Sequence, residues 1–104
     1  MTKVRVISGA CGFVTGIVAR KEGAKEVGVA VTSECEMVEK MAPEVAVLPA
    51  MAVFVRHPDN PVYRAAGKHL KHVACPVPCG ILKALEVEAG LNVPKDASIA
   101  FEKE

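Results

Sequence analysis

The chain contains no tryptophan, and aromatic residues make up only 4% of its 104 positions. Its hydrophobic fraction is nevertheless 51%, with a mean hydropathy of +0.28. Valine, alanine and leucine must therefore fill the core. A core so poor in large side chains is one that a subunit interface helps to complete, so we expect a homo-oligomer. The length suits a single domain over residues 1–104, and no Ser/Gly-rich linker divides it.

Neither sign of charge dominates, because 13 Lys and Arg side chains face 12 Asp and Glu, a net charge of +1. This balance disfavours nucleic acid and anionic membranes as partners. The longest apolar run, residues 45–55, contains a proline and is shorter than the roughly 20 residues that a spanning helix needs. The N-terminal residues alternate like a strand instead of forming a signal peptide, which predicts a cytoplasmic location. In that reducing compartment the four cysteines are expected as thiols or metal ligands.

Hydrophobic periodicity predicts an α+β fold, a mostly antiparallel sheet of three to five strands with helices packed on one face. Alternating side chains indicate strands near residues 3–8, 13–20 and 27–31, and a last strand around Ile99 and Phe101. Helical spacing indicates helices over 34–42, 61–72 and 78–90. Ser33 and Glu36 have the spacing of a capping box, which makes Ser33 the expected cap of the first helix. Residues 44–56 fit neither pattern.

The four cysteines stand at positions where a sulfur atom can reach a ligand. Cys35 and Cys79 fall in the first turns of two predicted helices, where the helix dipole favours a thiolate. Cys11 lies in the sequence SGACG between two strands, and its glycines let a ligand approach closely. Cys75 lies on the proline-rich segment CPVPC, which must interrupt the helical pattern because each proline lacks an amide hydrogen.

An iron–sulfur cluster or a zinc ion needs three or four converging thiolates, usually supplied by loops and helix starts. We therefore predict a metal site formed by Cys11, Cys35 and Cys79, with Cys75 or His72 as the fourth ligand. The C-x3-C spacing differs from the C-x2-C knuckle of zinc ribbons, so it selects no particular metal. A protein partner that receives the metal or its sulfur would follow from such a site.

Two other functions fit the same residues, and whether the protein is an enzyme stays open. One is a sulfur carrier or thiol enzyme that uses Cys79 or Cys75 with His72 as a base. The other is a structural or interaction module in which the cysteines are small buried side chains. The sequence contains no phosphate-binding glycine loop, no G-x-S-x-G elbow and no H-E-x-x-H pair.

With the cysteines placed on this architecture, residues 11–90 resemble the iron–sulfur scaffold proteins of the NifU/IscU type. Those proteins carry a Cys-Gly pair ahead of a strand, and Cys11-Gly12 stands in that place here. Their second cysteine lies between a strand and a helix, like Cys35, and their third lies at the start of a late apolar helix, like Cys79. The resemblance implies a related fold and cluster binding by these three residues. Phe13 stands where that family has an acidic residue.

The chain is also similar to a small family of uncharacterised bacterial and archaeal proteins. The similarity is clearest in the ending HVACPVPCGILKALEVEAGLNVPKD, residues 72–96. This second resemblance implies no activity.

Overall fold

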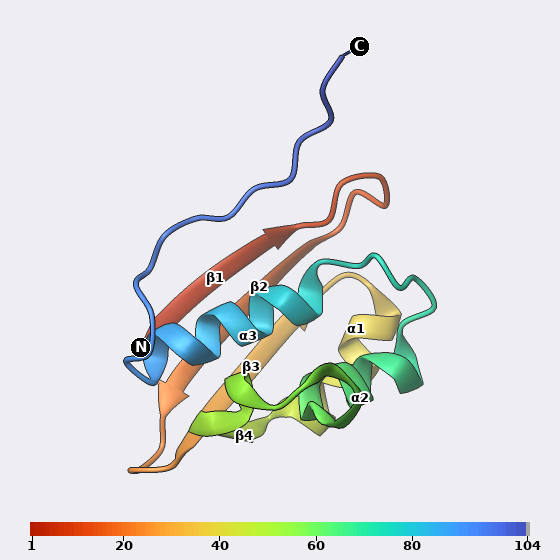
Figure 1. Cartoon of the computed structure of the whole chain (residues 1–104). Helices are drawn as coiled ribbons and strands as arrows, with labels where there is room; N and C mark the ends of the chain where they lie inside the picture. Colours follow the sequence, from red (N-terminus) through yellow and green to blue (C-terminus); the bar gives the residue numbers. More distant parts are fainter. Residues whose placement is uncertain (104) are drawn as a thin grey trace.

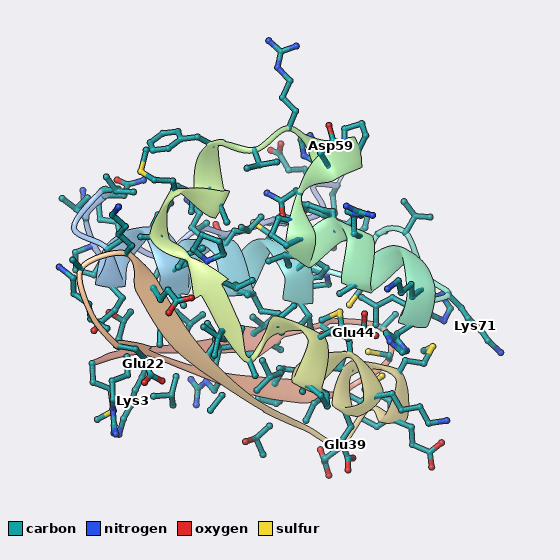
Figure 2. The ribbon with its side chains drawn as sticks, turned by 90° about the horizontal axis from the view of Figure 1, so that it is seen from below. Lys3, Glu22, Glu39, Glu44, Asp59 and Lys71 are labelled. Atoms are coloured by element: carbon teal, nitrogen blue, oxygen red, sulfur yellow. The ribbon has the colours of Figure 1, made fainter. Side chains whose placement is uncertain are left out.

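The computed structural model describes residues 1–103. Four antiparallel strands form one sheet in the order β1–β2–β3–β4, and the helices lie over one face of it (Figures 1 and 2). The strands are β1 (Thr2–Ile7), β2 (Val14–Lys21), β3 (Glu26–Ser33) and β4 (Val47–Pro49). The helices are α1 (Glu36–Met41), α2 (Pro61–His69) and α3 (Val77–Glu88), with short 3-10 turns η1 (Ala42–Val45), η2 (Ala50–Phe54) and η3 (His57–Asp59). The predicted α+β class and antiparallel sheet are confirmed.

The alternation of side chains along the strands decides which face of the sheet is buried. Val4 pairs with Ile17, and Ile17 pairs with Val31, so these three side chains lie on the face toward α3. Their neighbours Lys3 and Arg5 point to the opposite face, because successive strand residues face opposite sides. That opposite face has no helix on it (Figure 2).

The core is built from small and branched aliphatic side chains, as the composition predicts. Within residues 1–103 no aromatic side chain is among the buried hydrophobic residues. Ile81 and Leu85 of α3 are fully buried, and so are Ile17 of β2 and Leu48 of β4. Helix α3 lies along β1 and β2 and closes this half of the core (Figure 1).

Several predicted boundaries were wrong. Helix α2 ends at His69, three residues before the predicted end, and α3 begins at Val77, one residue before Pro78. The ambiguous segment 44–56 forms the short strand β4 between 3-10 turns. The predicted last strand is absent from the described residues: residues 91–103 run away from the domain as an extended segment (Figure 1).

No helix within residues 1–103 combines the length and the apolar character needed to cross a bilayer.

Candidate functional site

Cys11 lies at the exposed tip of the β1–β2 hairpin. The Ser8 N–H donates to the Phe13 carbonyl at 3.1 Å, and the Gly12 N–H donates to the Gly9 carbonyl at 2.8 Å. Gly9 and Gly12 have φ values of 82° and 77°, which side chains rarely allow. The glycines around Cys11 are therefore required by the turn, and they leave its thiol exposed.

Cys35 is the residue that caps α1, and the prediction that Ser33 does so was wrong by two positions. The Ser33 hydroxyl instead accepts from the Cys35 N–H at 3.1 Å and from the Thr15 hydroxyl at 2.8 Å. Thr15 is buried and pairs with Ser33 across β2 and β3, so this hydroxyl pair ties the end of β3 to the sheet. Cys35 follows directly and packs half-buried against the core.

Cys75 and Cys79 lie on either side of the start of α3. The Cys75 N–H donates to the His72 carbonyl at 3.2 Å, which closes the turn that leads into the helix. Pro76 is the N-cap of α3, so Cys79 is the third helical residue. Cys75 is half-buried against the core, whereas Cys79 is exposed. Cys79 thus lies in the first turn of α3 and Cys75 just outside the helix.

The packing of Gly80 brings the start of α3 to the same end of the sheet as the hairpin tip. A Cβ atom at Gly80 would lie 2.4 Å from Val6 Cγ2 and 3.2 Å from Ile17 Cδ1, so the helix sits directly on β1 and β2 there. The Thr15–Ser33 pair places the end of β3 beside this point.

Negative charge on some of the thiols affects the pKa of neighbouring groups. Burial raises the pKa of Cys75, and negative charge on Cys35 and on Cys11 raises it further, while the Val77 N–H lowers it. Charge on Cys79 acts instead on Tyr63 of α2, whose pKa is raised first by burial and then by that charge. The thiols of Cys11 and Cys35 thus lie near enough for their charge to act on Cys75, and the thiol of Cys79 lies near enough to act on Tyr63 of α2.

The thiols of the described residues do not form a metal site in this structure. Within residues 1–103 no group of three His, Cys, Asp or Glu side chains is arranged so that it could hold a metal ion. His72, the predicted nitrogen ligand, is exposed in the turn before α3. All four cysteines are free thiols.

A polar cluster that sequence reasoning missed lies where η1 meets the end of α2. The Glu44 carboxylate accepts from His69 Nε2 and from Lys68 Nζ, the second at 3.2 Å. These two hydrogen bonds, led by that of His69, lower the pKa of Glu44. Glu44 stands in the segment that fitted no pattern, and only the adjacent basic residues at the end of α2 hinted at an acidic neighbour.

A model of one protein family matches residues 2–101 of this arrangement. The chain belongs to DUF6951, a family of unknown function. This fits the resemblance to a family without an assigned activity, and it gives no support to the resemblance to NifU/IscU-type proteins. Comparison with curated proteins gives no match, and neither does comparison with solved structures.

Proposed function

We propose that the protein binds a thiophilic metal ion or an iron–sulfur cluster through Cys11, Cys35 and Cys75. The observation that supports this most is that charges on Cys11 and Cys35, which lie on segments far away in the sequence, act on the thiol of Cys75. Sequence reasoning favoured Cys79 as the third ligand. We take Cys75 in its place, because charge on Cys11 and Cys35 acts on Cys75, whereas charge on Cys79 acts on Tyr63.

The electrostatics of Cys75 give a reason for a cation at this place. Negative charges on Cys35 and Cys11 disfavour ionisation of Cys75 while no cation balances them. A bound metal ion reverses this, because thiolates rather than thiols are its ligands, and binding then releases protons. The exposed tip that carries Cys11 has to close toward Cys75, since no group in the described residues is already tight enough. Zinc and iron–sulfur clusters both accept three thiolates with a fourth position open to another ligand.

Metal analysis of protein purified without air tests this proposal. We expect stoichiometric zinc or iron in the wild type and its loss in the variants C11S, C35S and C75S. C79S is the matched control, because it removes, from the same end of the domain, a thiol whose charge acts on Tyr63. We expect the C79S variant to keep its metal. Wild-type protein free of metal, and unable to take up zinc or a reconstituted cluster, would contradict the proposal.

A second candidate is thiol chemistry at Cys79, as in a sulfur carrier or thiol enzyme. Its supporting observation is that Cys79 is exposed in the first turn of α3, whereas burial and neighbouring charge disfavour the thiolate of Cys75. Alkylation at neutral pH followed by mass spectrometry tests it. Cys79 should react much faster than Cys11, which is also exposed and serves as an internal control. Equal rates at the two residues would count against a nucleophile.

The proposal includes a cytoplasmic location, in which free thiols persist, and a protein partner that receives the metal or sulfur. Likeness to the NifU/IscU scaffold proteins remains a hypothesis that rests on the cysteine order alone. The purely structural alternative fits Cys35 and Cys75, which are half-buried, better than it fits the exposed Cys11 and Cys79.

A further inference from the structure

The C-terminal segment carries large apolar side chains that are almost fully exposed. The exposed fraction is 91% for Ile99 and 103% for Phe101. The segment leaves the end of α3 close to the beginning of β1, where the Thr2 hydroxyl donates to Glu88 at 2.7 Å, and then runs into solvent (Figure 1). The family match extends to residue 101, so this segment is part of what the family shares.

Strand β1 offers a free edge of the length that this segment needs. β1 is the outer strand of the sheet, next to β2 alone. The hydrogen bond from the Ser8 N–H to the Phe13 carbonyl shows that these two residues form a hydrogen-bonded pair. Hydrogen-bonded and non-hydrogen-bonded pairs alternate from there along β1 and β2. It follows that the backbone N–H and C=O groups of Lys3, Arg5 and Ile7 point away from β2, toward the free edge.

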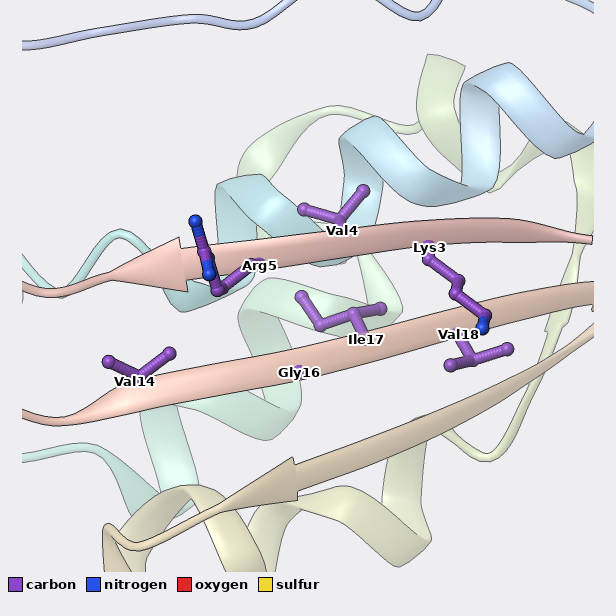
Figure 3. Close-up of a pocket in the computed structure, with 7 residues that line it drawn as sticks. All are labelled: Lys3, Val4, Arg5, Val14, Gly16, Ile17 and Val18. Carbon is purple, nitrogen blue, oxygen red and sulfur yellow. The ribbon is translucent and has the colours of Figure 1, made fainter.

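The two faces of β1 differ in chemistry. The side chains of Lys3 and Arg5 stand on the open face, beside a shallow hollow that is also lined by Val14, Gly16 and Val18 (Figure 3). On the other face, Val4 and Val6 pack toward α3, and Val4 is only partly buried. A strand added at this edge therefore needs acidic side chains on one face and apolar side chains on the other.

The C-terminal segment has this pattern in the required period of two. Asp96 and Glu102 fall on one face of an extended chain, and Ile99 and Phe101 fall on the other. Lys3 and Arg5 are two residues apart, so one acidic residue, Glu102, lies beside them, and Ile99 and Phe101 then necessarily lie beside Val4 and the flank of α3. A shift by one residue would reverse both matches, so the pattern specifies the register.

We propose that residues 96–103 of one copy add as a strand to the β1 edge of a second copy, so that two chains exchange their C-terminal segments. Within one chain the segment runs free although its own β1 edge starts nearby, which points to an edge on another molecule. The cations Lys3 and Arg5 disfavour direct pairing of two β1 edges and favour an acidic segment. Exchange between two copies closes on itself, and both edges are then covered.

The mass in solution, measured by light scattering with a reductant present, tests this proposal. The wild type should have twice the 11.0 kDa of one chain, and the double variant I99D/F101D should be monomeric with an unchanged far-UV circular dichroism spectrum. F54D is the matched control: Phe54 is another exposed aromatic side chain, at 65%, and its replacement should leave the dimer intact. A monomeric wild type, or a dimer that survives I99D/F101D, would overturn the exchange.

Hydrogen exchange of the edge amides distinguishes exchange from pairing within one chain. The amides of Lys3, Arg5 and Ile7 should be protected at high concentration and lose protection on dilution. Protection that is independent of concentration would mean that the segment covers its own edge, and would overturn the proposal. R5P removes one edge N–H without touching the β1–β2 ladder, because proline is tolerated at a free edge, and it should also give a monomer.

Discussion

Asn60 is the polar side chain on which the start of α2 depends. It is buried, yet every hydrogen-bonding group of its amide has a partner. Its Oδ1 accepts from the Val62 and Tyr63 N–H groups, and its Nδ2 donates to the carbonyls of Ala52 and Val55 at 2.9 and 3.0 Å. One side chain thus caps α2 and holds η2 in place.

We predict that N60A lowers the free energy of unfolding by about 2 kcal/mol, because it removes a helix cap and the two hydrogen bonds to the carbonyls of Ala52 and Val55. Chemical denaturation measures this change. Asn92 provides the control: it lies exposed and donates to Glu86 at 3.0 Å, so N92A should change stability by less than about 0.5 kcal/mol. Equal effects of the two substitutions would show that Asn60 contributes no more than a surface amide.

Two helical glycines are predicted to respond to alanine with opposite signs. At Gly80 a Cβ would lie 2.4 Å from Val6 Cγ2, so G80A should destabilise the fold by about 1–3 kcal/mol through overpacking. At Gly67 nothing lies within 4 Å, so G67A should stabilise α2 by about 0.5–1 kcal/mol through helix propensity. Thermal unfolding of both variants checks the pair. A G80A variant as stable as the wild type would contradict the close packing of α3 on β1.

At the residue scale, the sequence predicts local geometry well and tertiary partners poorly. The start of α2 at Pro61 was predicted, since an asparagine followed by a proline is a local signal of a helix start. The role of Ser33 was not, because its hydroxyl faces two competing donors, and the partner Thr15 comes from a strand that only the folded sheet places beside it.

At the scale of the elements, Glu88 fastens the end of α3 to the sheet. Its carboxylate accepts from the Thr2 hydroxyl at 2.7 Å and from the Lys21 N–H at 2.9 Å. These two bonds, that of Thr2 first, hold the pKa of Glu88 below its ordinary value of 4.5. Because the folded state favours the ionised form, this contribution to stability is present above the ordinary pKa and is lost as the pH falls through the lower folded one.

We therefore predict that the wild type loses stability on acidification partly through Glu88. E88Q should be about 1 kcal/mol less stable at neutral pH and should lose less stability between neutral and acidic pH. T2V, which removes the first donor, should raise the pKa of Glu88. Urea unfolding at a series of pH values measures both effects. If E88Q kept the full acid dependence of the wild type, Glu88 would have no part in it.

Strand and helix types were predictable wherever burial and periodicity agree. Ile17 and Ala19 of β2 and Val27 and Val29 of β3 face one buried side, and the apolar stripe of α3 lies on the sheet. Residues 44–56 were not predictable, since a three-residue strand between 3-10 turns has no period to detect. Ile99 and Phe101 have the two-residue spacing of a strand, yet they form no strand in the single chain. The proposed exchange accounts for that pattern.

At the scale of the whole molecule, three long-range contacts bring the cysteines to one end of the domain. Cys11 lies at the tip of the β1–β2 hairpin, and the hydrogen bond between Thr15 and Ser33 positions the neighbouring Cys35. The close packing of Gly80 on β1 and β2 positions the turn that carries Cys75. The cysteine positions on loops and helix starts were predictable from local signals. The difference in burial between Cys75 and Cys79 was not, because it depends on how α3 packs on the sheet.

The charge-transfer absorbance of cadmium–thiolate bonds reports the number of thiolate ligands per bound cadmium ion, and it tests whether Cys11, Cys35 and Cys75 bind one metal ion together. In an anaerobic titration of the wild type we predict saturation at one ion per chain. The absorbance per ion should fall by about one third in C11S, C35S and C75S and stay unchanged in C79S. A titration without charge-transfer absorbance, or one in which only C79S loses it, would contradict the account.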